Sequence, residues 1–222
     1  MIEHVYRRAA AASSIARVIV ATDDRRIADA VERFGGEARM TSASHQSGTD
    51  RLAEVAATLD CGLVVNVQGD EPLLAPETID AAVSAFADPG ADNAPALEMS
   101  TLRRQITDAA ELQNPNVTKV VVDADGFAMY FSRAPIPFTR AGQPAATAWA
   151  HVGLYVYRRE TLLRLAAWPP TTLERAEALE QLRALEHGIR IKAVTTAYHT
   201  IGVDTQEDLE RVRALLAQTI TT

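Results

Sequence analysis

The short run Leu63–Val67 constrains the fold more than any other stretch of the chain. It is apolar on mostly consecutive residues, and Gly69, Asp70 and Glu71 follow it almost at once. Consecutive apolar residues are typical of a central parallel strand that is covered on both faces. Because parallel strands are joined by crossover connections that usually contain a helix, strands and helices should alternate along the chain around this run.

The first 90 residues show this alternation. Short β-branched or apolar runs are followed by polar turns and then by apolar residues at helical spacing. The expected strands are Val18–Thr22 and Glu37–Met40, and the expected helices are Ile27–Phe34, Leu52–Leu59 and Glu77–Phe86. Asp23 or Asp24 offers the N-cap of the first of these helices. The pattern predicts an α/β fold with a Rossmann-like, doubly wound mixed sheet and right-handed crossovers.

The second half of the chain has a different pattern. Residues 117–131 form two apolar runs around an Asp-Gly turn, which predicts a β-hairpin. Further expected elements are the strands Ala148–Tyr157 and Ile189–Thr195, the helix Glu174–His187, and a final helix that opens at Asp204. No repeat or low-complexity linker divides the chain, so we expect one domain, 1–222, with an inserted substrate or dimerisation lobe at about 128–172.

Composition excludes several classes of protein. The net charge of -7 argues against a surface built for nucleic acid, and no segment approaches the roughly 20 apolar residues of a membrane span. The chain has a single cysteine, Cys61, which cannot form an intrachain disulfide. A reducing compartment is therefore expected, and the predicted location is cytoplasmic.

Two acids at predicted strand ends are candidate metal ligands. Asp70 follows the run Leu63–Val67, and Asp204 lies in the segment GVDT far along the chain. Ligands of open α/β sheets bind beyond the carboxyl ends of strands, and Mg²⁺ often takes one or two carboxylates plus substrate phosphates. The alternative for either acid, and for Glu71, is capping of the helix that follows.

A polar loop is the candidate nucleotide-binding segment. It crowds hydroxyls, an amide, a glycine and an arginine at a predicted helix N-terminus, where unpaired N–H groups favour an anionic ligand. Its residues include His45, Gln46, Ser47, Gly48 and Arg51. Helix capping by Ser47 or Thr49 is the alternative, and it accounts for only one of these side chains.

Other polar residues of the second half have both functional and structural interpretations. His151 and Tyr155 lie on one face of a predicted strand, Arg133 follows the hairpin, and Glu180 and Gln181 lie in a predicted helix. A lone histidine on a strand is more often structural than catalytic, and a Glu-Gln pair can be a solvated helix face.

Seven segments spread over the whole chain carry a family resemblance. In order they are VIVATDD, HQSGTDRLAEV, VNVQGDEP, NPNVTKVVVDADGFAMYFSRAPIP, HVGLYVYRRETL, LEQLRALEHG and GVDTQEDLERV. In this order they resemble the 3-deoxy-manno-octulosonate cytidylyltransferase family, also called CMP-KDO synthetases, which have the fold of nucleotide-diphospho-sugar transferases.

The resemblance implies an enzyme that transfers CMP from CTP to the 2-hydroxyl of KDO, an eight-carbon sugar acid. The products are CMP-KDO, for lipopolysaccharide biosynthesis, and pyrophosphate. By the same resemblance, Asp70 and Asp204 hold Mg²⁺, and the protein is a homodimer. The nucleotide side would comprise His45, Gln46, Ser47, Gly48, Arg51 and Gln68. The sugar-acid side would comprise Arg133, His151, Tyr155, Glu180 and Gln181.

The sequence departs from the family pattern at its front. Family members begin with a strand and a loop rich in glycine, arginine and lysine, whereas this chain starts inside the helix that follows, at Met1-Ile2-Glu3-His4-Val5. We expect the natural protein to be longer, because without that first strand the neighbouring strands keep unpaired edges. A chain that begins at Met1 is expected to bind CTP weakly and to turn over little.

Two alternatives to this function are carried forward. The first is a cytidylyltransferase for another sugar acid, such as a sialic acid or an amino analogue of KDO. The second is a non-catalytic form that only binds the sugar acid or pairs with a full-length subunit.

Overall fold

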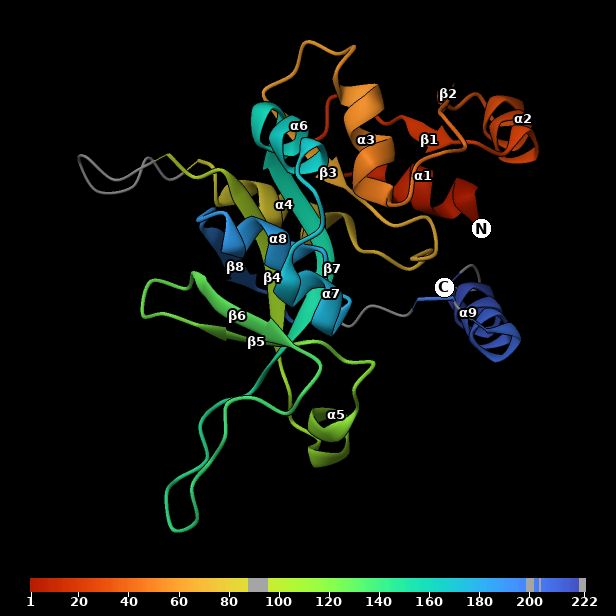
Figure 1. The fold of residues 1–222 in the computed structure, drawn as a ribbon. Coiled ribbons are helices and arrows are strands. Elements are labelled where there is room, and N and C mark those ends of the chain that lie inside the picture. Colours follow the sequence, from red (N-terminus) through yellow and green to blue (C-terminus); the bar gives the residue numbers. More distant parts are fainter. Residues whose placement is uncertain (88–95, 199–201, 204, 220–222) are drawn as a thin grey trace. The chain divides into compact units, whose positions relative to one another are not determined.

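The computed structural model describes residues 1–87, 96–198, 202–203 and 205–219 (Figure 1). Contacts along the chain divide it into two compact units. The first unit comprises Met1–Leu59, Asn66–Asp80 and Tyr198–Thr222, and the second comprises Asp60–Val65 and Ala81–Ala197.

The first unit has the strand and helix alternation that the sequence predicts. Its elements are α1 (Ile2–Ala10), β1 (Val20–Thr22), α2 (Arg25–Arg33), β2 (Ala38–Met40), α3 (Gly48–Ala56), the start of α4 (Pro76–Ser84) and α9 (Gln206–Thr219). β1 and β2 are parallel, with Val20 opposite Ala38 and Thr22 opposite Met40. Among the described residues, β2 is the only strand that pairs with β1.

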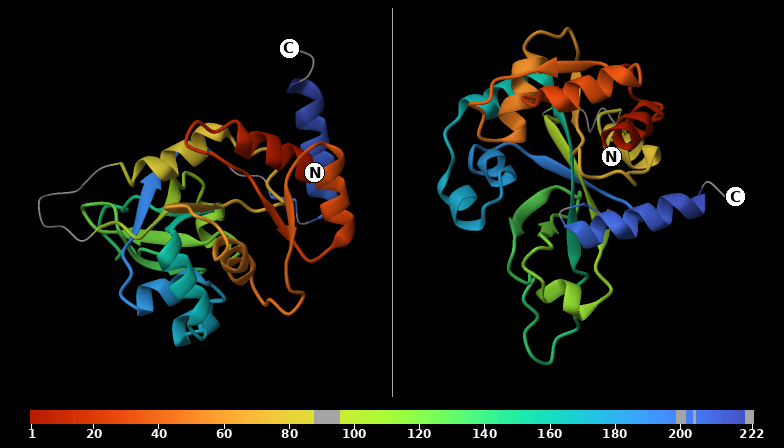
Figure 2. Two further views of the ribbon diagram at one scale, coloured as in Figure 1. Left: turned by 90° about the horizontal axis from the view of Figure 1, so that it is seen from above. Right: turned by 90° about the vertical axis from the view of Figure 1, so that its right-hand side faces the viewer.

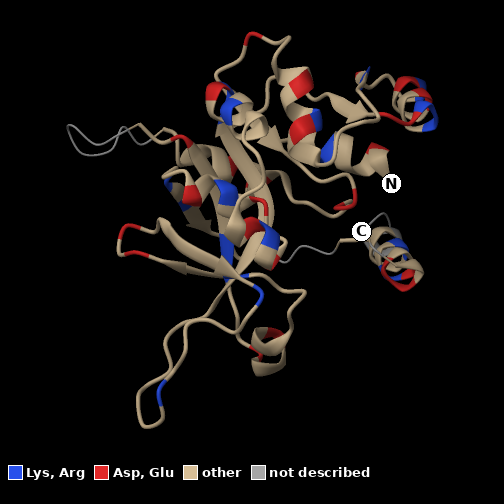
Figure 3. Ribbon diagram, viewed as in Figure 1, with Lys and Arg blue, Asp and Glu red and all other residues tan. Residues whose placement is uncertain are grey.

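Helix α2 shows how the local sequence sets its two ends. The Asp24 side chain accepts a hydrogen bond from the Arg26 backbone N–H at 2.8 Å, which is the N-cap that the sequence predicts. At the other end Gly35 has a φ of +80°, a conformation that glycine adopts without a steric penalty. On α2 and α9 acidic and basic residues are interspersed (Figure 3).

A carboxylate on α4 anchors the segment after α1. Asp80 accepts hydrogen bonds from the backbone N–H and the hydroxyl of both Ser13 and Ser14, at distances between 2.6 and 3.0 Å. The Ser14 and Ser13 donors lower the pKa of Asp80 to about 2. The ionised carboxylate therefore joins two segments of the first unit that are more than 60 positions apart in sequence.

We expect Asp80→Asn to lower the free energy of unfolding by about 1 kcal/mol at neutral pH. The Ser13 and Ser14 donors share the two carboxylate oxygens of Asp80, whereas an amide has only one acceptor oxygen. The depressed pKa of Asp80 adds stability above the unfolded pKa, and this stability is lost as pH falls toward 2. Urea unfolding from pH 7 to pH 2 should therefore show the two proteins converging in acid. The exposed Glu77→Gln on the same helix is the control, and a constant difference at all pH values would contradict the prediction.

The second unit is built on a mixed six-stranded sheet. Its strands are β3 (Leu63–Asn66, whose last residue belongs to the first unit), β4 (Met99–Gln105), β5 (Lys119–Val122), β6 (Ala128–Ser132), β7 (Trp149–Arg158) and β8 (Ile191–Thr195). The order is β6-β5-β7-β4-β8, and β3 also pairs with β7. β4 is parallel to β8 and antiparallel to β7. The mixed α/β sheet predicted from the sequence is thus confirmed.

Within the described part of the second unit, four helices accompany the sheet, together with the end of α4. They are α5 (Ala109–Gln113), α6 (Arg159–Ala167), α7 (Thr172–Glu177) and α8 (Gln181–Glu186). α7 and α8 pack against each other, and α8 also contacts β6. Two further views show the sheet and these helices from above and from the side (Figure 2). Every helix among the described residues is too short or too polar to cross a membrane.

The predicted hairpin is confirmed. β5 and β6 are antiparallel, and the turn between them contains Gly126 with a φ of +79°. The loop from β6 to β7 then leaves the sheet without forming a helix or a strand, as the prolines at 135 and 137 suggest, and it extends away from the sheet (Figure 1). The lobe predicted at about 128–172 includes this loop, and its boundaries stay a prediction.

The prediction of one helix over Glu174–His187 is wrong. The segment forms α7 and α8, and it breaks at Ala178, whose φ of 51° and ψ of 50° are left-handed. Two hydrogen bonds from the Arg133 side chain, to the carbonyls of Glu177 and Ala178, accompany the break. Both contacts come from a single residue about 45 positions away, so helical spacing within the segment could not reveal them.

Candidate active site

The predicted nucleotide-binding loop lies in the first unit and leads into α3. The Ser47 hydroxyl accepts a hydrogen bond from the Asp50 backbone N–H at 3.1 Å, so Ser47 does act as the N-cap. Gly48 is the first residue of the helix, and the Gln46 side chain donates to the Ser44 carbonyl at 2.9 Å. Capping therefore explains Ser47 but leaves His45 and Arg51 to be explained by their own contacts.

His45 is paired with an acid of the following helix. Its Nε2 is within hydrogen-bond reach of Glu54 Oε2, and the Ser42 backbone N–H donates to the same oxygen at 3.0 Å. The Ser42 N–H and His45 lower the pKa of Glu54. The ionised carboxylate thus fixes the orientation of the His45 ring at the start of the loop.

Arg51 links the carboxyl ends of the two parallel strands of the first unit. Its Nη1 donates to the Thr41 hydroxyl at 2.5 Å, and its Nη2 lies 3.2 Å from Asp23 Oδ2. Thr41 directly follows β2 and Asp23 directly follows β1. Because ligands of such sheets bind beyond these strand ends, Arg51 is held where a nucleotide site is expected.

The segment QGDEP also lies in the first unit, and it contacts the region of the second predicted acid. The Val203 backbone N–H donates to the Asp70 carbonyl at 3.0 Å, which brings the chain immediately before Asp204 beside Asp70. Asp204 itself lies outside the described residues. Gln68 donates from its side chain to the buried Asn66, at 2.9 Å. The backbones of these two segments therefore meet, and the sharing of one cation by the two carboxylates stays a prediction.

The two acids of this segment have different surroundings. Burial, and then the charge of Asp70, raise the pKa of Glu71 to about 7. Glu71 is therefore only partly ionised in neutral solution. Carboxylate oxygens, such as those that Asp70 offers, are the hard ligands that Mg²⁺ prefers. Among the described residues no group of three or more His, Cys, Asp or Glu could hold a metal. One or two carboxylates suffice for Mg²⁺ when substrate phosphates supply further ligands.

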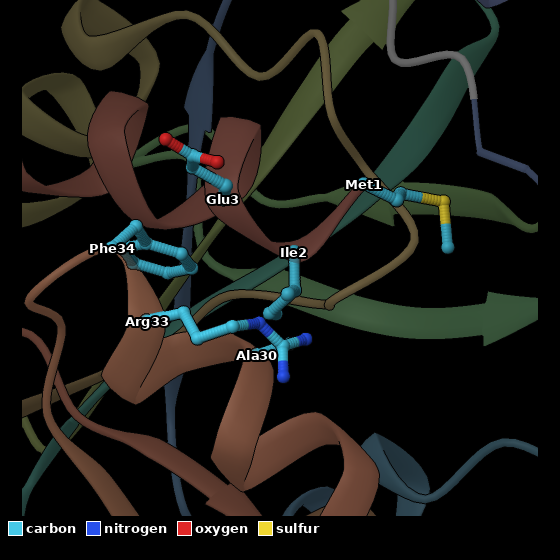
Figure 4. Close-up of a pocket in the computed structure, with 6 residues that line it drawn as sticks. All are labelled: Met1, Ile2, Glu3, Ala30, Arg33 and Phe34. Atoms are coloured by element: carbon cyan, nitrogen blue, oxygen red, sulfur yellow. The ribbon is translucent and has the colours of Figure 1, made fainter.

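A hollow of about 330 Å³ lies elsewhere in the first unit, between α1 and α2 (Figure 4). Its lining is Met1, Ile2, Glu3, Ala30, Arg33 and Phe34. None of the predicted site residues lines it. The candidate site is therefore defined by its polar side chains and not by this hollow.

The predicted sugar-acid residues lie in the second unit. His151 and Tyr155 project from β7 with ring centroids 5.3 Å apart, and the Phe131 and His151 rings pack edge to face with centroids 5.1 Å apart. Burial lowers the pKa of His151 to about 3, so its ring is neutral at physiological pH. Burial, with Tyr157 and Glu180 nearby, raises the pKa of Tyr155. Glu180 is close enough to Tyr155 to affect it, and the buried Gln181 begins α8.

Arg133 makes mostly backbone contacts. Its guanidinium donates to the carbonyls of Glu177 at 2.7 Å, Pro115 at 3.1 Å and Ala178 at 3.3 Å. A guanidinium has five N–H groups, so N–H groups remain for a ligand. Arg133 therefore fixes the left-handed turn before Glu180, and its contact with a sugar-acid carboxylate stays a prediction.

The left-handed Ala178 gives a test of this turn. Ala178 is exposed, so we expect Ala178→Gly to relieve the penalty of about 1–2 kcal/mol for a left-handed alanine. Part of this gain should be lost, because glycine raises the conformational entropy of the unfolded chain. The expected net result is a rise of about 0.5–1 kcal/mol in the free energy of unfolding, measured with urea. Ala214→Gly in α9 is the control, since an exposed glycine inside a helix should destabilise. Destabilisation by both variants would refute a strained Ala178.

Two residues that the sequence analysis missed support this site. Lys119 is fully buried, and its ammonium donates to the carbonyls of Asn114, Val117 and Arg133 at 2.6–2.9 Å. Glu177 accepts hydrogen bonds from the Ser132 hydroxyl and from the Arg133 N–H. Lys119 lies in a strand of apolar pattern and Glu177 in a charged helix, so no local sequence feature distinguishes them.

Comparison with known proteins places this chain in a class and then in a family. The family model described as "Cytidylyltransferase" matches residues 1–191, so the chain belongs to the cytidylyltransferases. Relatives named 3-deoxy-manno-octulosonate cytidylyltransferase are 51% identical in Geobacter sulfurreducens and 53% identical in Syntrophotalea carbinolica. The alignments cover 96% and 97% of this chain and 87% and 88% of the relatives. Within the class, the chain is therefore a member of the 3-deoxy-manno-octulosonate cytidylyltransferase family, as its sequence segments indicated.

Solved structures agree with this assignment. A structure of CMP:2-keto-3-deoxy-manno-octonic acid synthetase complexed with CTP has a TM-score of 0.91 and 44% identity, over 98% of this chain and 88% of that one. The 4-diphosphocytidyl-2C-methyl-D-erythritol synthase of Anaerococcus prevotii has a TM-score of 0.61 at 18% identity, which shows a shared fold only.

Proposed function

We propose that this protein transfers CMP from CTP to the 2-hydroxyl of 3-deoxy-D-manno-octulosonate, giving CMP-KDO and pyrophosphate for lipopolysaccharide biosynthesis. The observation that carries this proposal is about 50% identity, over nearly the whole chain, to relatives named for this activity. The structural similarity to a synthetase solved with CTP supports CTP as the nucleotide.

The reaction is a displacement at phosphorus. The 2-hydroxyl oxygen of KDO attacks the α-phosphorus of CTP, the bond from that phosphorus to the bridging oxygen of pyrophosphate breaks, and the hydroxyl proton leaves to solvent or base. Charge builds on phosphate oxygens as this happens. Asp70 and Asp204, whose carboxylates are hard oxygen ligands, would hold Mg²⁺, and the cation would stabilise that charge.

The protein's own groups would bind and orient the two substrates. On the nucleotide side, Arg51 is pre-positioned by Thr41 and Asp23, and His45 by Glu54. The other residues assigned to this side are Gln46, Ser47, Gly48 and Gln68. On the sugar-acid side, the neutral His151 and protonated Tyr155 are suited to hydrogen bonds with hydroxyls, and Arg133 to the carboxylate. Glu180 and Gln181 complete the proposed set.

Pyrophosphate release is the deciding measurement. We expect release that depends on CTP, KDO and Mg²⁺ together, with CMP-KDO identified by mass. Parallel reactions with a sialic acid and an amino analogue of KDO test the alternative substrates, and preference for either would overturn the assignment of KDO. Calorimetry measures the binding of KDO and of CTP with Mg²⁺. Binding of KDO without any release of pyrophosphate would instead indicate the non-catalytic alternative.

Homodimer formation and a cytoplasmic location also belong to the proposal. Phe138, in the loop between β6 and β7, is 88% exposed, which is unusual for a large apolar side chain and supports a partner surface there. Analytical ultracentrifugation of the wild type and of Phe138→Ser tests the dimer. The single cysteine supports a reducing, cytoplasmic compartment.

A further inference from the structure

Thr101 lies completely buried on β4, and its hydroxyl faces three polar groups of β7. The Oγ1 atom is 2.9 Å from His151 Nε2, 2.8 Å from the Leu154 carbonyl oxygen and 3.3 Å from the Val152 carbonyl oxygen. The pairing of β4 with β7 shifts register between Thr101 and Leu102. This irregularity directs carbonyls of β7 toward the threonine side chain.

The Thr101 hydroxyl can donate only one hydrogen bond, and this fixes the direction of its hydrogen bond with His151. A threonine hydroxyl has one hydrogen, and a carbonyl oxygen can only accept. The shortest contact to a carbonyl is the one to Leu154, so the hydroxyl donates there. Toward His151 it can then only accept, which requires a hydrogen on Nε2.

The other ring nitrogen is left as an acceptor. A neutral imidazole carries one N–H, so a hydrogen on Nε2 leaves a lone pair on Nδ1. The ring is neutral because burial lowers its pKa to about 3. Nδ1 makes no hydrogen bond to any described residue. Since it is also absent from the fully buried side-chain atoms that lack a partner, it keeps some accessible surface. Phe131, Tyr155 and Thr101 contact the ring and are uncharged in neutral solution. The charged residue opposite His151 in the pairing of β4 with β7 is Arg103.

We propose that Thr101 is a positioning residue that holds His151 in the Nε2–H tautomer, so that Nδ1 accepts a hydrogen bond from a hydroxyl of the sugar acid. The second part rests on the proposed function, because it needs a polyhydroxy substrate at His151. The first part concerns the substrate-free protein alone. A tautomer that is fixed before binding favours a ligand hydroxyl over a ligand group that can only accept. It also removes the free-energy cost of selecting this tautomer when the ligand binds.

Nuclear magnetic resonance of the histidine ring nitrogens tests the first part. In ¹⁵N-labelled wild-type protein without substrate, we expect Nε2 of His151 to be protonated and Nδ1 to be unprotonated, with the signals assigned by their loss in His151→Gln. Thr101→Val keeps the volume but removes the acceptor, so the two tautomers should mix, and Thr101→Ser should restore the wild-type pattern. The affinity for KDO, followed in the same spectra, should fall about tenfold in Thr101→Val and recover in Thr101→Ser.

A buried hydroxyl on the adjacent residue provides the matched control. Ser100 is equally buried on β4 but donates to the Ala82 carbonyl, at 2.7 Å. Ser100→Ala should cost stability yet leave both the His151 tautomer and the KDO affinity unchanged.

Several outcomes would overturn the proposal. An Nδ1–H tautomer or a charged ring in the wild type refutes it even if Thr101→Val fails to fold. An unchanged tautomer in a folded Thr101→Val refutes the role of Thr101. If the wild type neither binds nor uses KDO, the proposed function fails, while the tautomer still decides whether Thr101 positions His151.

Discussion

Replacing Arg183 by methionine should lower the free energy of unfolding by about 3–5 kcal/mol, because it leaves a buried carboxylate without its partner. Arg183 and Glu174 are both buried, with Nε 2.8 Å from Oε2 and Nη2 2.5 Å from Oε1. The same guanidinium donates to the carbonyls of Leu165 and Trp168. One side chain thus joins α7 and α8 to the end of α6.

The pH dependence of the variant should identify the cause. Burial alone would raise the pKa of Glu174, but the hydrogen bonds from Arg183 and from the Thr171 N–H outweigh it and lower the pKa. The wild type therefore keeps this contribution at neutral pH and loses it only in acid, below the unfolded pKa. In Arg183→Met the buried acid should take up a proton at higher pH, so the variant should gain stability as pH falls from 7 to 5.

Denaturant unfolding at several pH values measures both effects. Arg25→Met is the matched control, since Arg25 and Asp29 form an ion pair on α2 at 2.7 Å with side chains 68% and 44% exposed. Loss of such a pair should cost less than about 1 kcal/mol. A loss in Arg183→Met no larger than in this control would refute the buried pair as a major source of stability.

The features that could be predicted from sequence were mainly those that residues close together in the chain determine. The Asp24 cap and the hairpin turn at Gly126 depend on residues within a few positions, and both are as predicted. The run Leu63–Val67 gave β3 within one residue of its bounds. Such features follow from local backbone chemistry.

What could not be predicted depends on contacts between distant segments. β4 was missed because its sequence, MSTLRRQ, mixes apolar and charged residues, although its first four residues are buried between β7 and β8. The break at Ala178 is accompanied by hydrogen bonds from Arg133, which no helical periodicity encodes. Thr101 had no distinguishing pattern either, since its contact with His151 spans 50 positions. In each case tertiary contact outweighs local preference.

The residues of the candidate site also fall into two groups, those that could be predicted from sequence and those that could not. The family motifs named its residues, and backbone contact places the segment before Asp204 beside Asp70. The residues that hold the named ones in place, such as Glu54 for His45 and Lys119 for Arg133, emerged only from the structure. Motifs identify groups with distinctive chemistry, whereas supporting residues are recognised by what they touch.

Asp70→Asn should reduce CTP-dependent and KDO-dependent pyrophosphate release by about 10²–10³-fold, because we propose its carboxylate as a ligand of Mg²⁺. Such a ligand supports several kcal/mol of transition-state stabilisation, and each 1.4 kcal/mol is roughly tenfold in rate. Calorimetry should show a parallel loss of Mg²⁺-dependent CTP binding, a readout that does not require turnover. Asp125→Asn, in the exposed turn between β5 and β6, is the matched control and should change neither quantity.

Stability separates loss of a ligand from loss of the fold. The charge of Asp70 helps to raise the pKa of the half-buried Glu71, so neutralising Asp70 removes a repulsion and should leave stability equal or higher at neutral pH. An inactive Asp70→Asn that unfolds at the wild-type urea concentration or above it therefore indicates a functional carboxylate. Wild-type release and wild-type Mg²⁺ dependence in this variant would remove Asp70 from the metal site, and Asp204→Asn would then show whether the strand-end acids take part at all.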